Sequence, residues 1–404
     1  MIKTEYYKDL TKMNTFGMKV KARCFMEYDS VADLVDIEFE ELARPVLHIG
    51  GGSNLLFTDD FKGTVLHSKI NFIEILDDSP CHSEERVSCH SEERSDVAIY
   101  VSVGAGVVFD DFCAWAAKEG LWGVENLSYI PGEVGASAVQ NIGAYGVEVK
   151  DVIHKVYCYD TVEEEFVSFS VEECEYGYRD SIFKDPEIKG RYIVTHVVFA
   201  LSREPRPRLE YGHLKEAVTS AYGECQSVPE APSQASLGPS PYPGVGKCLF
   251  HTNGTSPENG DASIERHLTP GLIRKVIIKI RKEKLPEPSV MGSAGSFFKN
   301  PVITVEHFKR IEAAAEAELG PDCKVPHYDL PDGMVKVPAA WMIEQCGWKG
   351  RRSGGAAVYD KQPLVIVNYT GEAYPEEIVG LEKRVMASVK AKFDVDLHPE
   401  VEHV

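Results

Sequence analysis

The chain of 404 residues predicts an α+β protein with more than one domain. Segments with helical and strand periodicity follow one another in mixed order, without the strict strand–helix alternation of a doubly wound sheet. The length allows two or three domains, each with its own hydrophobic core. Two low-complexity stretches, at residues 77–96 and 223–268, interrupt the pattern.

Apolar patterns in the first half of the chain predict mainly strands. We expect them at residues 20–28, 46–49, 55–57, 99–103, 152–159 and 192–201. Ser30 is a suitable N-cap for a helix that carries Val31, Leu34, Val35 and Leu42 on one face. Residues 110–118 predict a second helix, with Gly120 just past its end.

The second half of the chain predicts mainly helices. They are expected near residues 272–282, 305–319, 339–346 and 375–393, with strands near 358 and 364–368.

Charge and cysteine content narrow the classes of function. The formal net charge is -20, so polyanions are poor partners and no nucleic-acid binding is expected. The ten cysteines are scattered without a C-x-x-C pair, as expected for reduced thiols. The N-terminus has no apolar signal region and no apolar run reaches membrane-spanning length, so we expect a cytoplasmic protein without membrane insertion.

The two interrupting stretches predict surface insertions. The hexamer C-H-S-E-E-R occurs twice within residues 77–96. A zinc site of Cys81, His82, Cys89 and His90 is the alternative, but the spacing fits no zinc finger, so no metal site is expected. Residues 223–268 are rich in Pro, Ser and Gly and predict a mobile excursion.

Three segments rich in small residues predict a site for a flat, polar cofactor. Successive glycine amides form a positive concavity suited to a pyrophosphate, although none of the segments is a P-loop or a Rossmann fingerprint. Backbone can approach a ligand closely where side chains are small. The predicted cofactor-binding residues are Gly50, Gly51, Gly52, Ser53, Asn54, Gly104, Gly106, Ile130, Pro131, Gly132, Gly135, Ala136, Gln140, Asn141, Gly143, Ala144 and Tyr145.

Three side chains are candidates for chemistry. Ser296, in G-S-A-G-S-F-F-K-N-P, can deliver a proton, although a glycine turn into a Phe-Phe core strand is the ordinary alternative. Arg179, in G-Y-R-D-S-I-F-K, offers a planar fork for a carboxylate or an enolate, and its alternative is a surface pair with Asp180. Glu400 stands in L-H-P-E-V, where a terminal Glu is usually just solvated.

The ordered set of motifs resembles the UDP-N-acetylenolpyruvoylglucosamine reductase family, also called UDP-N-acetylmuramate dehydrogenases, from about Asn14 to Glu400. The set is G-G-G-S-N, I-P-G-x-V-G with Q-N-I-G-A-Y-G, G-Y-R-D-S-I-F-K, K-L-P-x-P with G-S-A-G-S-F-F-K-N-P, and P-E-V. The resemblance implies the two-subdomain FAD-binding fold of the vanillyl-alcohol-oxidase (PCMH) type, plus a C-terminal α+β substrate-binding domain. The domains implied are 1–68, 69–202, 203–394, and a C-terminal strand at 395–404 that returns to the active site.

The resemblance also implies the reaction and the residue roles. NADPH reduces FAD, which passes hydride from N5 to the terminal enolpyruvyl carbon of UDP-N-acetylglucosamine enolpyruvate. Ser296 then donates the proton, while Arg179 and Glu400 stabilise the enolate. Whether Glu400 donates a proton or orients Arg179 stays open. The implied substrate-binding residues are Tyr178, Tyr211 on the closing loop of the longer form of the family, Lys284 and Asn300.

Two other functions are weighed against the reductase. A flavin oxidase of the same fold would tether FAD through a histidine, for which His48 is the candidate. A catalytically inactive nucleotide-sugar or flavin binder is the other. Tyr359 stands where many members of the reductase family have histidine, so the contact made by that histidine is in question for this chain. The resemblance implies a monomer.

Overall fold

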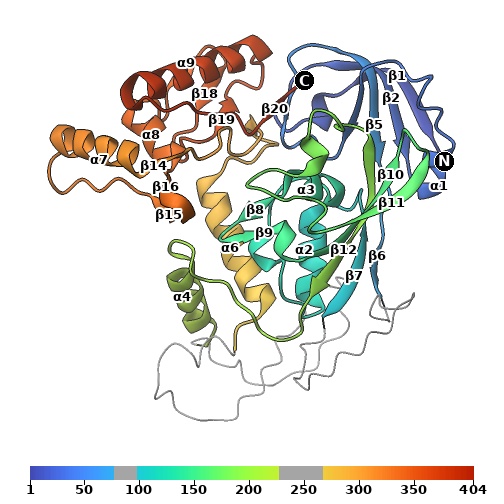
Figure 1. Ribbon diagram of the computed structural model, residues 1–404, viewed down its shortest axis with the longest axis horizontal. Coiled ribbons are helices and arrows are strands. Elements are labelled where there is room, and N and C mark those ends of the chain that lie inside the picture. The colour runs from blue at the N-terminus through green and yellow to red at the C-terminus, as the bar shows by residue number, and fades with distance from the viewer. Residues whose placement is uncertain (77–97, 227–266) are drawn as a thin grey trace, which may run out of the picture.

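The computed structural model describes residues 1–76, 98–226 and 267–404. These residues form a first lobe around the N-terminal sheet, a second lobe around a larger sheet, and a C-terminal lobe (Figure 1). The predicted insertion at 77–96, with its four candidate zinc ligands, lies outside the described residues, as does most of the predicted excursion at 223–268.

The first lobe is a four-stranded sheet in the order β1-β2-β5-β3. Strands β2, β5 and β3 run parallel, and β1 is an antiparallel edge strand. The Ser30 side chain caps α1 in a capping box with Asp33, as predicted, but the helix ends at Val35 and so does not include Leu42. The elements of this lobe are β1 (Lys3–Asp9), β2 (Lys21–Tyr28), α1 (Val31–Val35), β3 (Val46–Ile49), β4 (Leu55–Leu56) and β5 (Phe61–Ser68).

The second lobe is an antiparallel sheet in the order β11-β10-β12-β7-β6. Helices α2 and α3 pack against it, with the rings of Phe112 and Phe199 4.6 Å apart in the buried layer. The elements are β6 (Ile73–Ile75), β7 (Ile99–Gly104), α2 (Phe109–Lys118), α3 (Val134–Gln140), β8 (Gly143–Ala144), β9 (Val147–Glu148), β10 (Ile153–Asp160), β11 (Glu165–Ser170) and β12 (Tyr192–Leu201).

Helices α4 (Leu214–Gln226) and α6 (Pro270–Lys284) pack against each other, and α6 also packs on α2. The side chain of Thr269 caps α6, and Pro270 occupies its first turn, where a missing N–H costs nothing. An ion pair between Arg274 and Asp110 joins α6 to α2. The beginning of the predicted third domain therefore rests on the second lobe, and the predicted domain boundaries stay predictions.

The C-terminal lobe contains two small sheets, in the orders β13-β19-β18-β17 and β14-β16-β15, and three helices. Helix α9 buries Ile378, Leu381, Val385 and Val389 on one face, at helical spacing. The elements are β13 (Gly292–Ser293), β14 (Val302–Thr304), α7 (Val305–Leu319), β15 (Tyr328–Leu330), β16 (Met334–Lys336), α8 (Ala339–Gln345), β17 (Arg352–Ser353), β18 (Ala356–Val358), β19 (Ile366–Asn368), α9 (Pro375–Phe393) and β20 (Glu402–His403).

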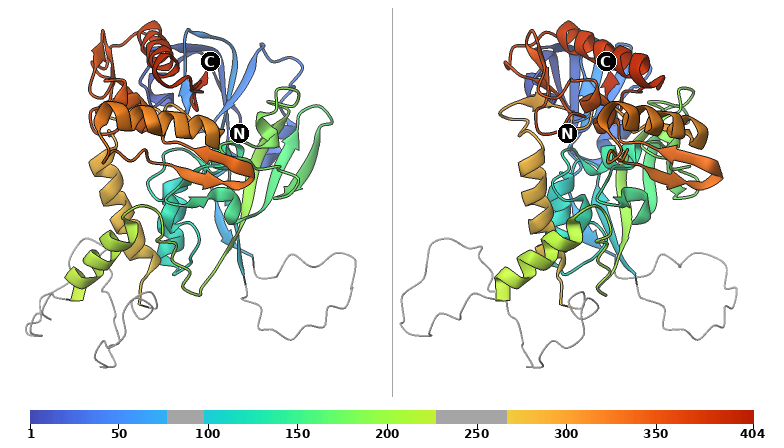
Figure 2. Two further views of the ribbon diagram at one scale, coloured as in Figure 1. Left: turned by 60° about the vertical axis from the view of Figure 1, so that its left-hand side comes forward. Right: turned by 90° about the vertical axis from the view of Figure 1, so that its left-hand side faces the viewer.

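The first and C-terminal lobes share one hydrophobic core. Phe16 and Val65 belong to the same buried cluster as Phe297 and Val385. Strand β20 pairs in parallel with β4 of the first lobe, so the C-terminus lies beside the N-terminal sheet (Figures 1 and 2). This return of the chain brings its last residues to the junction of all three lobes.

Within the described ranges, no helix is both long enough and apolar enough to cross a lipid bilayer.

Candidate functional site

The three small-residue segments meet where the first and second lobes join. The Ser53 hydroxyl donates to the carbonyl of Pro131 at 3.0 Å, which links the first segment to the longest one. The Gly135 amide donates to the carbonyl of Ala105 at 2.9 Å, which links the longest segment to the 103–106 turn. A Cβ atom at Gly135 would lie only 2.9 Å from the Cβ of Ala105, so this close packing requires glycine. The longest segment contains helix α3, which the glycine and alanine content did not predict.

This junction fits the diphosphate group of FAD. The consecutive backbone amides of Gly51, Gly52 and Ser53 donate to no acceptor within the described part of the chain. Successive unpaired amides in a turn form an anion-binding concavity. Pro131 and Ala136, both exposed, border the same junction.

Replacing Gly135 by valine should weaken FAD binding by at least about 10-fold, because the new side chain pushes α3 away from the 103–106 turn. Flavin fluorescence during equilibrium titration with FAD measures this. The matched control is Gly380→Ala on α9, where a Cβ meets no atom within 4 Å. Equal FAD affinity in the Gly135 variant and the wild type would exclude this junction as the cofactor site.

A buried histidine network lies beside the same junction. His67 on β5 is 3 % exposed, with Nδ1 3.1 Å from an oxygen of Glu27 and Nε2 3.0 Å from an oxygen of Glu133. Burial alone would lower the pKa of His67, but Glu133 and then Glu27 outweigh both burial and the charge of Lys69, and raise it. Glu133 immediately precedes α3 and lies against Gly50. The imidazole of His67 therefore ties the first sheet to the start of α3.

Replacing His67 by glutamine should lower the stability of the protein by about 3 kcal/mol at acidic pH, because the buried Glu133 and the partly buried Glu27 lose their cation. The folded pKa lies above the ordinary value of 6.5, so this contribution is complete below that value and is lost as pH rises through the folded pKa. Urea unfolding of both proteins between about pH 5.5 and pH 9 should show the difference shrinking at high pH. A difference that does not change with pH would show that His67 carries no charge in the folded protein.

Arg179 lies at the tip of a tight turn between Gly177 and Asp180, whose backbone amides and carbonyls bond reciprocally. Its φ is +57°, a left-handed conformation that costs a non-glycine residue about 1 to 2 kcal/mol. The guanidinium Nη1 and Nη2 donate to the carbonyls of Asn141 and Gly143 at 3.2 and 2.6 Å. These bonds hold the plane of the guanidinium while leaving part of its donor set free.

The third bond of Arg179 joins it to Glu400. The Nε donates to Glu400 Oε1 at 2.8 Å, and the two side chains are only 16 % and 13 % exposed. This geometry supports the alternative in which Glu400 orients Arg179. Arg179 therefore pairs with Glu400, and not with Asp180 as the surface-pair alternative predicted.

Ser296 is brought to this pair by the backbone. The Glu400 amide donates to the carbonyl of Phe297 at 2.8 Å, and Phe298 forms an isolated antiparallel β-bridge with Pro399. Phe297 and Phe298 are fully buried, so the ordinary alternative of a Phe-Phe core segment is also true of these two residues. Ser296 itself is exposed, and its hydroxyl has no hydrogen-bond partner among the described residues. The Ser296 and Glu400 segments are therefore adjacent in the backbone, and Arg179 reaches them through its side chain.

Four tyrosines, Tyr145, Tyr178, Tyr211 and Tyr328, lie near one another, and Tyr178 lies beside Arg179. The ring of Tyr211 lies edge-on to Tyr145, with centroids 6.1 Å apart, and Tyr211 is 47 % exposed. Burial of its hydroxyl and then the neighbouring Tyr328 raise the pKa of Tyr211 to about 12, so it keeps its proton. Tyr178 lies under the Lys336 ammonium, 4.1 Å from the ring centroid. The predicted closing-loop tyrosine thus lies beside Tyr145 and Tyr328.

The other predicted residues take different positions. The side chain of Asn141 is buried and bonds to Glu148 and to the Gly177 carbonyl, so it supports the Arg179 turn. The amide oxygen of Asn300 accepts from the backbone of Ala339 at 3.0 Å. Lys284 is exposed at the end of α6.

Tyr359 and His48, whose roles the sequence left open, both have partners in the fold. Tyr359 packs in a small cluster with Leu285 and Met291. His48 Nε2 lies 2.6 Å from the Tyr28 hydroxyl, and burial, followed by the charge of His67, lowers the pKa of His48 to about 4. Because its Nε2 is engaged by Tyr28, His48 is poorly placed to tether a flavin.

Three groups near Arg179 were not predicted. Lys184 donates to Gln140 and to the backbone of Arg179, Lys336 covers Tyr178, and Tyr328 contacts Tyr211. Lys184 belongs to the same G-Y-R-D-S-I-F-K motif, which is the one signal in the sequence that points to it. The sequence around Lys336 and Tyr328 contains no motif that points to these two residues.

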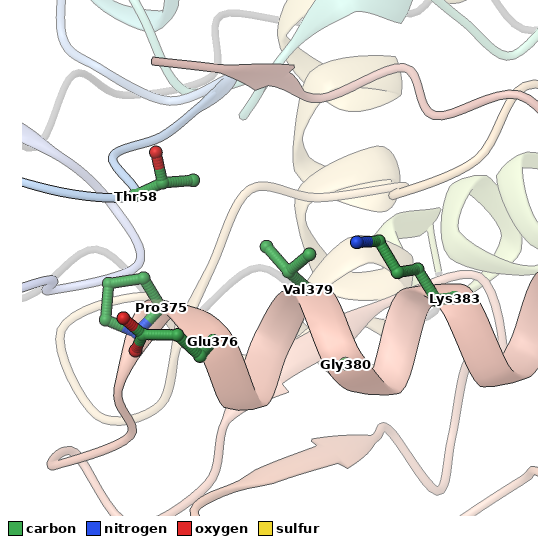
Figure 3. A pocket seen from close by; sticks show the side chains of 6 residues that line it. All are labelled: Thr58, Pro375, Glu376, Val379, Gly380 and Lys383. Carbon is green, nitrogen blue, oxygen red and sulfur yellow. The ribbon is translucent and has the colours of Figure 1, made fainter.

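Two further features lie away from this site. Among residues 1–76, 98–226 and 267–404, no three His, Cys, Asp or Glu side chains are grouped to hold a metal ion. A cavity of about 330 Å³ lies between Thr58 and the first turns of α9 (Figure 3), and none of the predicted site residues lines it.

Comparison with known proteins shows which family the chain resembles. The C-terminal domain of UDP-N-acetylenolpyruvoylglucosamine reductase matches residues 287–404, and an FAD binding domain matches residues 23–166. The UDP-N-acetylenolpyruvoylglucosamine reductase of Bacteroides fragilis is 44 % identical over 396 residues, which cover 98 % of each chain. The protein of the same name from Porphyromonas gingivalis is 38 % identical over 400 residues, covering 98 % of this chain and 97 % of the relative.

A solved structure agrees at the level of the fold. The crystal structure of UDP-N-acetylenolpyruvylglucosamine reductase from Thermus caldophilus matches with a TM-score of 0.56 at 19 % identity, covering 100 % of this chain and 98 % of that chain. The predicted α+β class, with a two-subdomain FAD-binding fold and a C-terminal α+β domain, is confirmed. The chain therefore belongs to the UDP-N-acetylenolpyruvoylglucosamine reductase family of FAD-dependent oxidoreductases.

Proposed function

We propose that this protein reduces UDP-N-acetylglucosamine enolpyruvate to UDP-N-acetylmuramate with electrons from NADPH, as a step of peptidoglycan precursor synthesis. The observation that carries the proposal is the pair of Arg179 and Glu400 beside the segment of Ser296. Full-length identity to relatives that carry the reductase name supports the same reaction.

Bound FAD, held at the junction of Gly50–Asn54 with residues 130–136, supplies the hydride that the terminal enolpyruvyl carbon receives. The remaining chemistry belongs to the protein. As the terminal carbon gains hydride, negative charge develops on the neighbouring carbon and spreads into its carboxylate.

Arg179 stabilises that charge. A guanidinium has five N–H donors, and three of them are engaged by Glu400, Asn141 and Gly143. The two that remain, one on each terminal nitrogen, suit the two oxygens of a carboxylate or an enediolate. Because Glu400 and the two carbonyls already fix the plane, the donors are preorganised where the charge appears.

Ser296 delivers the proton that completes the reaction. The carbon of an enediolate is strongly basic, so a weakly acidic hydroxyl is sufficient as the acid. The exposure of Ser296 lets water return a proton to its oxygen after the transfer. The substrate gains one hydride and one proton in all, and NADPH is oxidised to NADP⁺.

Substrate binding is assigned to the aromatic and polar groups around Arg179. Tyr178 and Tyr211 border the reacting group, and Lys284 and Asn300 hold the nucleotide diphosphate. The exposed Tyr211 lies against Gly146 and the ring of Tyr145, where a loop could close over bound substrate. A cytoplasmic, monomeric protein remains part of the proposal and rests on the sequence and on the resemblance.

Product analysis tests the proposal. The protein loaded with FAD is incubated with NADPH and UDP-N-acetylglucosamine enolpyruvate, and the nucleotide sugar is examined by mass spectrometry. A product heavier by two hydrogen atoms, formed in proportion to the NADPH consumed, is expected. Consumption of NADPH by oxygen alone, with the nucleotide sugar unchanged, would favour the flavin oxidase.

A further inference from the structure

Lys184 is a half-buried ammonium group without a carboxylate partner in the described chain. It ends the 3₁₀ turn Ile182–Lys184, and its Nζ donates to two neutral oxygens, Gln140 Oε1 at 2.8 Å and the Arg179 carbonyl at 3.0 Å. Burial and then the charge of Lys299 lower the pKa of Lys184, and together they outweigh the opposite effect of Asp180, Glu400 and Glu402. A cation that hydrogen-bonds only to neutral groups is a poor source of stability, because no directly bonded carboxylate compensates its desolvation.

The two acceptors of Lys184 belong to the two parts of the chain that fix Arg179. One is the carbonyl of Arg179 itself, whose positive φ requires the surrounding structure to hold the turn. The other is the side chain of Gln140 at the end of α3, and the next residue, Asn141, offers the carbonyl to which Arg179 Nη1 donates. Lys184 therefore connects the backbone that carries the guanidinium to the helix end that receives it.

The buried side-chain nitrogen of Gln140 has no hydrogen-bond partner among the described residues. Its oxygen is held by Lys184 alone, so loss of the ammonium leaves the whole amide of Gln140 without a partner. We expect the Arg179 turn to be held less firmly against the end of α3 when this happens, because the bond from Asn141 to the Gly177 carbonyl then acts without the support of Lys184.

We propose that Lys184 is a positioning residue for Arg179, and that it controls the rate of substrate reduction without contributing to the reduction of the flavin by NADPH. This inference rests on the proposed function. A positioning role through Arg179 predicts an effect on one half-reaction only, because only the substrate step uses the free donors of Arg179. A misplacement of about 1 Å in such a group costs about 100-fold in rate.

Lys184→Met and Lys184→Arg, each loaded with FAD, test this by anaerobic stopped-flow of both half-reactions. Lys184→Met should slow flavin reoxidation by UDP-N-acetylglucosamine enolpyruvate by about 10- to 100-fold, with flavin reduction by NADPH within about 2-fold of wild type. Lys184→Arg keeps N–H donors and should recover part of the loss. The matched control is Lys189→Met, whose ammonium pairs with Glu402 on the surface and should leave both rates unchanged.

Combination with Arg179→Lys separates positioning from a structural role. If Lys184 acts through Arg179, adding Lys184→Met to Arg179→Lys should slow substrate reduction by less than about 3-fold further. Multiplicative losses, or an equal fall in both half-reactions with loss of bound FAD, would overturn the proposal. Wild-type enzyme that is not reoxidised by the substrate would instead overturn the proposed function itself.

Discussion

Replacing Ser296 by alanine should slow reduction of the enolpyruvyl substrate by about 10² to 10⁴-fold, the usual contribution of a general acid. Flavin reduction by NADPH should stay near the wild-type rate, because that step does not use the Ser296 proton. Stopped-flow absorbance at the flavin band measures the two half-reactions separately. The prediction follows from an exposed hydroxyl on a backbone segment that is bonded directly to that of Glu400.

The conservative variant Ser296→Cys keeps a transferable proton and should be faster than the alanine variant. Ser289→Ala is the matched control, because Ser289 is an exposed serine seven residues earlier in the same lobe. If Ser296→Ala changes neither half-reaction, the proton comes from another group.

Replacing Arg179 by lysine should slow the substrate half-reaction by about 10² to 10³-fold, the cost of losing a preorganised donor to developing negative charge. A lysine ammonium cannot bond to Glu400, Asn141 and Gly143 together while presenting two further parallel donors. Because lysine keeps the positive charge, the loss of rate measures the contribution of the planar, forked geometry of the guanidinium. Flavin reduction by NADPH should be much less affected.

Arg208→Lys provides the matched control, since Arg208 forms an exposed single contact with Asp151 and lies outside the proposed machinery. Near-normal substrate reduction by the Arg179→Lys protein would remove Arg179 from the mechanism. A loss of bound FAD in that variant would show instead that the turn supports the cofactor site.

The local elements of the fold were largely predictable from the sequence. Helices α7 and α9 begin and end at the predicted residues, because their apolar faces repeat at helical spacing between clear caps. Helix α3 was not predicted, because its glycines and alanines show no apolar face, and close packing against Ala105 forms it. The extent of α1 was overestimated, because the apolar spacing of Leu42 continues past the residue where the helix ends.

The site depends on contacts that local patterns do not contain. Arg179 and Glu400 are 221 residues apart, and their pairing follows from the return of the C-terminal strand to β4. Only the resemblance to a family brought these residues and Ser296 together in advance. Lys184 was within a quoted motif, but its partners are a backbone carbonyl and an amide, and such contacts leave no pattern in a sequence.

Anaerobic absorbance of the FAD-loaded protein, with NADPH added first and UDP-N-acetylglucosamine enolpyruvate second, tests the proposed function most directly. We expect NADPH to bleach the flavin band and the enolpyruvyl substrate to restore it in the absence of oxygen. A flavin that NADPH bleaches but only oxygen restores would contradict the reductase assignment.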